Sequence, residues 1–346
     1  MADVNRRIVL AARPEGAPRE TDFRLEQGPI PRPGPGQFLI RNLYLSLDPY
    51  QRGRMNPSWR YGRGLEIGDT MICGTVGEVI ESNHPAYRKG EIVEGLLGWQ
   101  EYALHDGLGE RANYGLGLTR IDPARGPLST ALGVNGMPGE TAYFSIIEAA
   151  RPKPGDTVVV TGAAGAVGSL AGQIAKLFGA RVVGLAGSDA KVDYLVNELG
   201  FDVGINYKTA PDLMQAIRAA CPDRIDVYYD NVGGPIADMM FRWLNRHSRI
   251  VIVGRIAQYN DAKMRTMPDV FSQIMLARAS VIGFVVYDYD HRTEEARNRM
   301  ARWVKEGKIR YAETIAKGIE RAPEAFLSML TGGNTGKQLV QLYPPP

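Results

Sequence analysis

A short apolar strand that runs directly into a glycine-rich loop and an amphipathic helix constrains the fold of this chain more than any other feature. The strand is Thr157–Thr161 and the helix is Val167–Phe178. The residues predicted on one face of the helix are Leu170, Ile174, Leu177 and Phe178. The loop consists of Gly162, Ala163, Ala164, Gly165, Ala166, Val167 and Gly168. Because a helix that begins here presents free N–H groups and its positive dipole end, the segment suits a pyrophosphate.

Three glycines of this loop have separate mechanical roles. Gly162 permits the tight turn, Gly165 lets the backbone approach a ligand closely, and Gly168 lets the helix pack against the strand. Their spacing differs from the commoner Gly-x-Gly-x-x-Gly pattern, so a small-residue helix that merely packs on a sheet is the alternative. The position between a buried strand and an amphipathic helix favours a Rossmann-type dinucleotide-binding domain.

Strands and helices alternate after this loop. The further predicted strands are Arg181–Ala186, Ile225–Tyr229, Arg249–Val253 and Ser280–Val286. Alternating units of this kind predict a parallel sheet covered by helices on both faces. The last helix is expected at Glu294–Gly307, with its basic second half facing solvent. We therefore expect an α/β, doubly wound Rossmann-type domain over residues 129–307.

The first third of the chain indicates β-structure instead. The predicted strands are Gln37–Leu47, Gly74–Glu81 and Glu91–Leu104, and turn-rich segments separate them. They predict a small barrel-like β-domain over residues 1–128. We expect the tail, residues 308–346, to be irregular apart from a strand at Gln338–Leu342, and to return to this first domain and complete it.

The end of the second predicted strand indicates which dinucleotide binds. NAD-selective sites usually carry an acid there that binds the ribose 2′-OH, whereas this strand ends in Gly187 and Ser188. Lys191 follows and can pair with a 2′-phosphate, although a solvated surface lysine is the plainer alternative. Asp189 is either the missing acid in a shifted register or, as we expect, a residue of the next helix's first turn. The strand end favours NADPH.

The composition excludes several classes of function. The 41 basic and 38 acidic residues nearly balance, so no nucleic-acid or membrane partner is indicated. No apolar run is long enough for a signal segment or a membrane span, and we expect a cytoplasmic protein. The only cysteines, Cys73 and Cys221, lie far apart, and the four histidines are scattered. A disulfide framework and a cysteine-based zinc site are excluded, and no metal is expected.

Motifs along the whole chain fit one pattern. They are Leu47–Met55, Gly136–Gly139, Thr141–Tyr143, Gly162–Gly168, Gly187–Ser188 with Lys191, Asn206–Tyr207, Asp230–Gly234, Tyr259–Asn260, Gly283–Val286 and Asn334–Lys337. In this order they resemble the leukotriene B4 dehydrogenase/prostaglandin reductase branch of the zinc-independent medium-chain dehydrogenases/reductases. That branch includes plant alkenal double-bond reductases and bacterial curcumin-reductase-like enzymes.

The resemblance implies a GroES-like β-barrel domain beside the Rossmann domain, NADPH as the cofactor, no zinc, and commonly a homodimer. It implies that Lys191 and Tyr207 hold the 2′-phosphate. Asn231 and Asn334 would lie near the nicotinamide ribose, and Met137 near the nicotinamide. The other residues that it implies for cofactor binding are Thr141, Phe284, Val285 and Tyr259, together with Gly187, Ser188 and the loop Gly162–Gly168.

The resemblance also implies a reaction, the reduction of the C=C bond of an α,β-unsaturated aldehyde or ketone by hydride transfer to the β-carbon. Because charge then builds on the carbonyl oxygen, a donor such as the Tyr259 phenol lowers the barrier; an ordinary buried tyrosine is the alternative. Tyr50, Trp59, Tyr61 and Tyr259 are expected to wall an apolar substrate pocket at the domain interface. For Trp59 and Tyr61, a place in the β-domain core is an equal alternative.

Two departures from the family pattern affect the expected size of the substrate. Glu140 stands where the family usually has an apolar residue, and Arg255–Gln258 replaces a run of small residues. Two other functions stay open, an NADPH-dependent quinone reductase and a non-catalytic NADPH-binding protein. The apolar strand Ser280–Val286 is a candidate edge for pairing two subunits.

Overall fold

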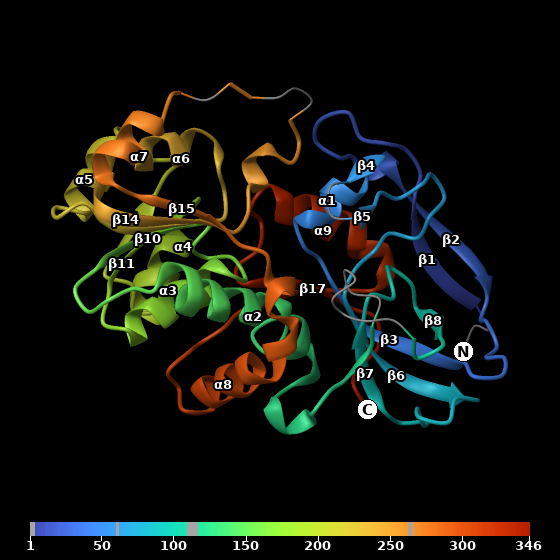
Figure 1. The fold of residues 1–346 in the computed structure, drawn as a ribbon. Helices are drawn as coiled ribbons and strands as arrows, with labels where there is room; N and C mark the ends of the chain where they lie inside the picture. Colours follow the sequence, from blue (N-terminus) through green and yellow to red (C-terminus); the bar gives the residue numbers. More distant parts are fainter. Residues whose placement is uncertain (1–3, 60–61, 109–116, 262–264, 267) are drawn as a thin grey trace. The chain divides into compact units, whose positions relative to one another are not determined.

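The tail of the chain returns to its beginning, so that two compact units form (Figure 1). One unit comprises Met1–Gly133 and Glu313–Pro346, and the other comprises Val134–Ala312. The computed structural model describes residues 4–59, 62–108, 117–261, 265–266 and 268–346. Both boundaries between the units fall slightly further along the chain than the sequence led us to expect.

The second unit is built on a parallel sheet of six strands in the order β12-β11-β10-β13-β14-β15. The strands are β10 (Thr157–Thr161), β11 (Arg181–Ala186), β12 (Val203–Asn206), β13 (Ile225–Asp230), β14 (Leu244–Ile252) and β15 (Ser280–Gly283). Both faces of the sheet are covered. Val158 and Val160 of β10 pack into one hydrophobic cluster and Val159 into another, as the alternation of side chains along a strand requires.

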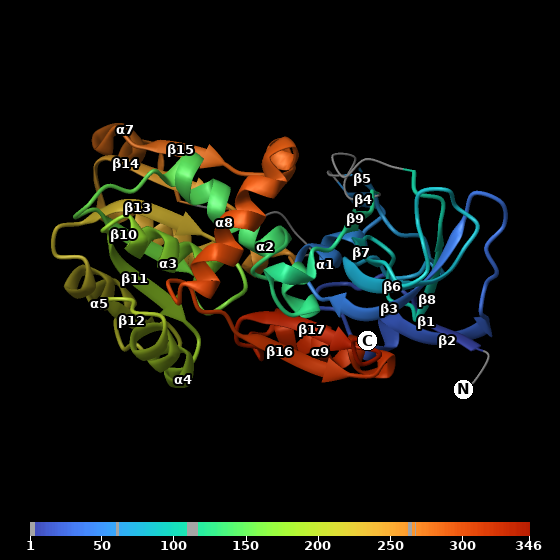
Figure 2. The same ribbon diagram turned by 90° about the horizontal axis from the view of Figure 1, so that it is seen from below.

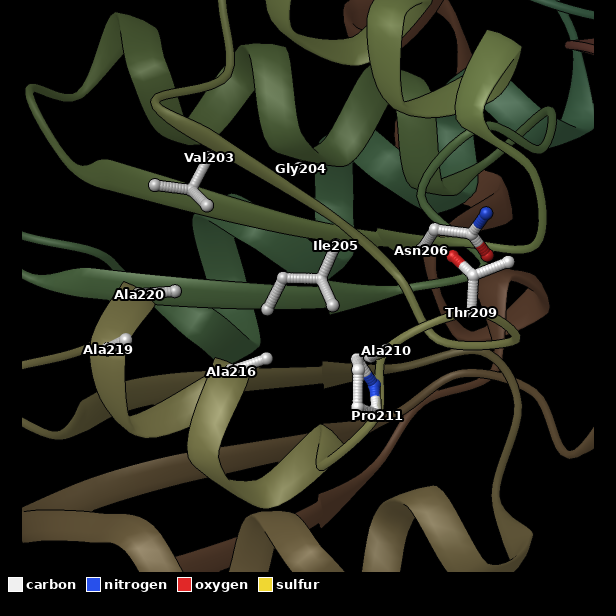
Figure 3. A pocket seen from close by; sticks show the side chains of 10 residues that line it. All are labelled: Val203, Gly204, Ile205, Asn206, Thr209, Ala210, Pro211, Ala216, Ala219 and Ala220. Atoms are coloured by element: carbon white, nitrogen blue, oxygen red, sulfur yellow. The ribbon is translucent and has the colours of Figure 1, made fainter.

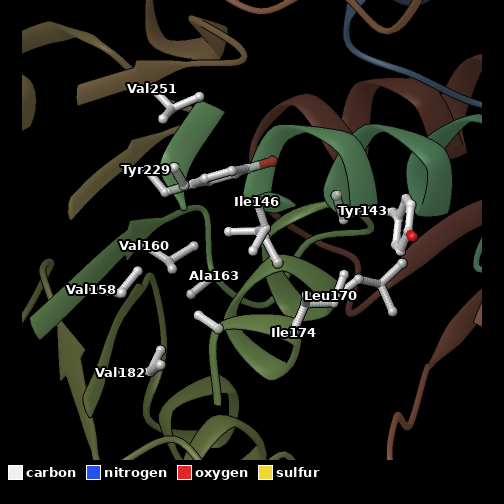
Figure 4. Packing of buried hydrophobic residues seen from close by; sticks show 14 of the residues in the cluster. Tyr143, Ile146, Val158, Val160, Ala163, Leu170, Ile174, Val182, Tyr229 and Val251 are labelled. Atoms are coloured by element: carbon white, nitrogen blue, oxygen red, sulfur yellow. The ribbon is translucent and has the colours of Figure 1, made fainter. Parts of the chain in front are cut away.

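Helices cover the two faces of this sheet (Figure 2). They are α2 (Met137–Phe144), α3 (Gly168–Leu177), α4 (Asp189–Asp193), α5 (Leu213–Ala220), α6 (Gly234–Met240), α7 (Phe271–Ala277) and α8 (Thr293–Lys305). Residues of α2, α3 and α8 share one cluster, and residues of α5, α6 and α7 share the other. Figure 4 shows the first cluster, where Leu170 and Ile174 of α3 pack toward Val158 and Val160. The expected doubly wound fold is confirmed.

Two details of the second unit differ from the sequence-based expectations. Leu177 and Phe178 are each 41% exposed, because α3 ends at Leu177 and the chain turns away through Gly179 at φ +80°. The buried face of α3 is completed by Ala171 and Ala175 instead. The strand expected at Ser280–Val286 is shorter, since β15 ends at Gly283 and a 3-10 turn begins at Val286.

The first unit is a β-structure around a long central strand. Its strands are β1 (Val4–Leu10), β2 (Phe23–Pro29), β3 (Phe38–Ser46), β4 (Ser58–Trp59), β5 (Gly62–Arg63), β6 (Thr75–Ser82), β7 (Ile92–Gly95), β8 (Tyr102–His105), β9 (Thr119–Arg120), β16 (Glu313–Lys317) and β17 (Lys337–Gln341). The central strand is β3, which pairs with β6 along one edge and with β8 and β17 along the other. This is the GroES-like β-domain expected from the sequence.

The tail contains more regular structure than the sequence suggested. Strand β16 runs parallel to β17, and helix α9 (Ala322–Leu330) lies between them in the chain. Phe326 of α9 is fully buried and makes edge contacts with Phe23 and Trp99. The prediction of an irregular tail was therefore wrong. A proline in the first turn of α9 and a pair of glycines after its end were the available signals.

A buried ion pair joins the tail to the loop after β3. The Lys337 ammonium group donates to Asp48 Oδ1 at 2.6 Å and to the Leu47 carbonyl at 2.7 Å. Both side chains are at most 8% exposed. The pair thus connects two of the sequence motifs, Leu47–Met55 and Asn334–Lys337, within one unit. Helix α1 (Tyr50–Arg54) begins two residues after Asp48.

A second buried ion pair joins α2 to α8 in the other unit. Arg297 Nε donates to Glu140 Oε1 at 2.7 Å, and each side chain is 2% exposed. Glu140, which departs from the family pattern, therefore has a charged partner in the core. Desolvating two charges is costly, so the loss of one partner destabilises far more than the replacement of both by apolar side chains.

We expect Arg297→Met to destabilise the second unit by about 3–5 kcal/mol, because it leaves the Glu140 carboxylate buried without its partner. The double variant Glu140→Leu/Arg297→Met should recover most of this loss. The measurement is the urea midpoint followed by circular dichroism, with Arg302→Met on the exposed side of α8 as the control. Equal losses in the single and double variants would contradict this account.

Candidate functional site

The loops that follow the parallel strands of the second unit carry most of the predicted site residues. The carboxyl ends of parallel strands meet at one edge of a sheet, and ligands of doubly wound folds bind in the crevice there. Strands β10, β11, β12, β13 and β14 all contribute a loop to this edge.

The glycine-rich loop after β10 has the geometry that a closely approaching ligand needs. Gly162 adopts φ +60°, which favours glycine. A Cβ atom on Gly168 would lie 2.4 Å from the Gly162 carbonyl oxygen, and one on Gly165 would lie 3.2 Å from it. Ala163 and Ala164 are buried, whereas Ala166 and Val167 are half-buried. The loop therefore fits a pyrophosphate at the start of α3.

The loop after β11 contains the residues predicted to choose the dinucleotide. Ser188 caps α4, and its hydroxyl oxygen accepts a hydrogen bond from the Lys191 N–H at 3.4 Å. A Cβ atom on Gly187 would lie 2.9 Å from the Tyr207 hydroxyl oxygen. Lys191 is half-buried, and burial followed by the charge of Lys208 lowers its pKa. The structure thus brings Gly187, Ser188, Lys191 and Tyr207 together.

Asp189 lies in the first turn of α4, as expected. Its carboxylate accepts a hydrogen bond from Asn206 Nδ2 at 2.7 Å. Asn206 ends the neighbouring strand β12, so Asp189 connects two loops of the carboxyl edge. Asp189 is therefore hydrogen-bonded to another residue of the protein, and it lies in the helix that follows the strand rather than at the strand tip.

The loop after β13 is held by the buried carboxylate of Asp230. Its Oδ1 atom accepts hydrogen bonds from the N–H groups of Val232 and Gly233 at 3.0 and 2.8 Å, and from the Thr161 hydroxyl at 3.0 Å. Asn231 Nδ2 donates to the Thr161 carbonyl at 2.8 Å. Asn231 is therefore fixed at the end of β10, beside the glycine-rich loop.

The loop after β14 packs against the loop after β13 and leads to Tyr259. The Ala257 N–H donates to the Val232 carbonyl at 3.0 Å, and a Cβ atom on Gly233 would lie 3.1 Å from the Gln258 amide oxygen and 3.2 Å from Arg255 Nε. The unusual run Arg255–Gln258 thus covers a glycine of the neighbouring loop. Tyr259 follows this turn and is half-buried.

Met137 and Thr141 lie one turn apart at the start of α2. The Thr141 hydroxyl donates to the Met137 carbonyl at 2.7 Å. Gly139 is required between them, because a Cβ atom there would lie 1.9 Å from the Val134 carbonyl oxygen. Glu140, one residue further, is the partner of Arg297, so the buried pair fixes the helix that carries both predicted contacts.

Phe284 and Val285 follow β15. The Phe284 N–H donates to the Ile252 carbonyl at 3.0 Å, and its ring stacks on Tyr289 with centroids 5.4 Å apart. Phe284 is buried and Val285 is half-buried. The core of the unit therefore fixes the backbone at this position, although the sequence placed it inside a longer strand.

The remaining predicted residues belong to the other unit. Tyr50 begins α1 and is half-buried. The Asn334 amide group donates to the Gly336 carbonyl at 2.8 Å within its turn. Trp59 lies in strand β4, whose side chains are outside the described part, and Tyr61 lies outside the described residues. The Asp48–Lys337 ion pair connects the segments that carry Tyr50 and Asn334.

One functional candidate was missed at the sequence level. Lys208 directly follows Tyr207, and a Cβ atom on Gly187 would lie 3.2 Å from its Cε atom. The signal was present as a second lysine beside a motif tyrosine. The signal was weak because Lys208 lies in the loop after β12, one strand beyond the one that normally selects the dinucleotide.

A surface hollow of about 560 Å³ lies along β12 (Figure 3). Its lining residues are Val203, Gly204, Ile205, Asn206, Thr209, Ala210, Pro211, Ala216, Ala219 and Ala220. Only Asn206 and Thr209 supply polar side chains, and they lie together at one end. None of its lining residues is titratable.

Within the described parts of the chain, no group of three or more His, Cys, Asp or Glu side chains is arranged to hold a metal ion. Both cysteines are buried, and burial raises the pKa of each thiol. No helix among the described residues is long and apolar enough to cross a membrane.

Two family descriptions match the chain, "N-terminal domain of oxidoreductase" over residues 6–111 and "Zinc-binding dehydrogenase" over residues 166–306. The NADPH-dependent curcumin reductase of Escherichia coli is 43% identical over 98% of this chain and 97% of that protein. The NADP(+)-dependent 2-alkenal reductase of Nicotiana tabacum is 37% identical, with 98% and 97% covered.

Solved structures of similar proteins have the same fold as this chain. The crystal structure of CurA from Vibrio vulnificus in complex with NADPH has a TM-score of 0.91 at 43% identity, and covers 98% of this chain and 100% of that one. The Escherichia coli quinone oxidoreductase has a TM-score of 0.76 at 17% identity over 97% and 100%, which shows the shared fold alone. Two units of the expected kinds, motifs in the expected order and relatives that match along the whole chain lead to one conclusion: this chain belongs to the zinc-independent medium-chain dehydrogenases/reductases, in the branch of the curcumin, prostaglandin and alkenal reductases.

Proposed function

We propose that this protein uses NADPH to reduce the C=C bond of α,β-unsaturated aldehydes and ketones. One observation carries the choice of cofactor: β11 ends at Ala186 and is followed by Gly187 and Ser188, with Tyr207 and Lys191 beside them and Asp189 hydrogen-bonded to Asn206. A 2′-phosphate can be accommodated at such a strand end, whereas a 2′-OH finds no acid at the strand tip. The similarity to curcumin and alkenal reductases supports the reaction.

The bound NADPH supplies the hydride, which adds to the β-carbon of the substrate. The C=C electron pair moves toward the carbonyl, and negative charge develops on its oxygen as an enolate. Tyr259 is the proposed donor to that oxygen, because its phenol can donate a hydrogen bond without prior ionisation. A proton from water then adds to the α-carbon and completes the saturated carbonyl product.

Other residues are proposed to position the two ligands. Met137 and Thr141 would contact the nicotinamide end of the cofactor from α2, and Phe284 and Val285 would do so from the end of β15. Asn231 and Asn334 would contact the nicotinamide ribose. Tyr50, Trp59 and Tyr61 would line the substrate pocket, together with Tyr259.

A homodimer is the second part of the proposal. Strand β15 is an edge strand, because among the described residues it pairs with β14 alone. Beside it in the chain, helix α7 exposes Phe271, Met275 and Leu276, which are 79%, 69% and 70% accessible, and β15 exposes Val281. Exposed apolar side chains next to an open strand edge fit a self-complementary interface.

The reaction is tested by following NADPH consumption with trans-2-nonenal and identifying the product. We expect the saturated aldehyde, with NADH a weak replacement. Tyr259→Phe should lower kcat by roughly 10²–10³-fold, by analogy with the loss of an oxyanion-hole donor. Its Kd for NADPH should change little, because the variant keeps the aromatic ring implied for cofactor binding and removes only the hydroxyl that acts on the substrate oxygen.

Tyr194→Phe is the matched control. The Tyr194 hydroxyl is buried without a hydrogen-bond partner among the described residues, and burial raises its pKa to about 12. Removing this hydroxyl should leave turnover unchanged. A quinone in place of the enal tests the alternative function, NADPH-dependent quinone reduction. Fast quinone reduction without enal reduction would favour the quinone reductase, and tight NADPH binding without any turnover would favour a binding protein.

The dimer is tested by light scattering after size exclusion, on wild type and Val281→Asp. A carboxylate on the edge strand would be desolvated in the proposed interface, so the variant should shift to the monomer mass. Leu25→Asp is the control, because Leu25 is a similarly exposed apolar residue on strand β2 of the other unit. A wild-type monomer would contradict the proposal.

A further inference from the structure

Lys208 lies at the end of β11 although it belongs to the loop after β12. A Cβ atom on Gly187 would meet Lys208 Cε at 3.2 Å and the Tyr207 hydroxyl oxygen at 2.9 Å. The two side chains therefore converge on the same glycine. Only a glycine leaves this space open, because any larger residue would have to displace one of them.

The backbone of Lys208 is fixed by hydrogen bonds between the two loops. Its N–H donates to Asn206 Oδ1 at 3.1 Å, and Asn206 Nδ2 donates to Asp189 Oδ1 at 2.7 Å. Asn206 thus connects the loop that carries Lys208 to the helix that carries Lys191. This connection ties together the two segments that carry the lysines.

The charge of Lys208 is not balanced by an acid among the described residues. Lys208 is exposed and forms no ion pair with any acidic side chain in the described part of the chain. Its charge is the second cause, after burial, of the lowered pKa of Lys191. The nearby carboxylate of Asp189 is engaged by Asn206. Two cations beside a phenol hydroxyl form an arrangement that a phosphate dianion satisfies with charge-assisted hydrogen bonds.

We propose that Lys208 is a second cationic contact of the ribose 2′-phosphate, so that Lys191, Lys208 and Tyr207 together select NADPH over NADH. The inference rests on the proposed NADPH cofactor but is independent of the reaction. Lys208 adds a charge from the loop after β12, the strand next to the usual selecting strand. The ordinary alternative is a solvated lysine that contributes nothing to binding.

The test measures binding, so it needs no turnover. Dissociation constants for NADPH, NADH and 2′,5′-ADP are determined by calorimetry on wild type, Lys208→Gln, Lys208→Arg and Lys305→Gln. The last is the matched control, since it removes one exposed charge from α8 of the same unit. We expect Lys208→Gln to weaken NADPH and 2′,5′-ADP binding by roughly tenfold, as for the loss of one hydrogen bond to a charged group.

Two further measurements show whether the lost affinity comes from the 2′-phosphate contact. The NADH dissociation constant should change by less than about twofold, because NADH lacks the phosphate that the lysine contacts. Lys208→Arg should retain most of the NADPH affinity. A loss no larger than that of Lys305→Gln, or an equal loss for NADPH and NADH, would overturn the inference. Lys208-dependent NADPH binding without enal reduction would uphold it and reject the proposed reaction.

The pH dependence gives an independent readout. Phosphate binding favours the protonated form of Lys191, so NADPH affinity should fall as the pH rises through the lowered pKa of Lys191. In Lys208→Gln one cause of that lowering is removed, and the fall should move to higher pH. An unchanged profile in Lys208→Gln would show that the two lysines do not act on one phosphate.

Discussion

The close approach of α3 to β10 is the constraint on which the rest of the site depends. Gly168 has no space for a Cβ atom, which would lie 2.4 Å from the Gly162 carbonyl oxygen. The helix can therefore begin soon after the strand end, at the carboxyl edge of the sheet. The loops after β11, β13 and β14 are arranged around this point, because parallel strands end at one edge.

Buried polar groups keep these loops in place. Asp230 accepts from one hydroxyl and two N–H groups, and Glu140 is paired with Arg297 in the core. Such groups stabilise a fold little in net terms, since desolvation offsets most of their attraction. They do penalise any arrangement that leaves them unpaired. The same holds in the β-unit for Lys337 and Asp48, which join two motifs 289 positions apart in the chain.

The sequence predicted the α/β unit more accurately than the tail. The bounds of β10 and β11 were predicted to the residue, because buried parallel strands are continuously apolar and glycines bound them. Helix α9 was missed, since its buried face is completed only when Phe326 meets Phe23 and Trp99 from distant positions. Among site residues, the Asp189 hydrogen bond and the position of Lys208 depend on β12 pairing with β11, which no local pattern encodes.

In this proposal, cofactor selection depends on what each side chain at the end of β11 contacts, as much as on which residue types are present there. An acid is present near the end of β11, and composition alone would allow it to bind a 2′-OH. The Asn206 amide donates a hydrogen bond to the Asp189 carboxylate. Gly187 leaves space that Tyr207 and Lys208 occupy from the loop after β12. A Gly187→Asp change would restore an acid at the strand tip only by displacing the Tyr207 phenol. The proposed preference for phosphate would thus depend on the packing of two loops, and an acid at position 187 would require the Tyr207 and Lys208 side chains to move.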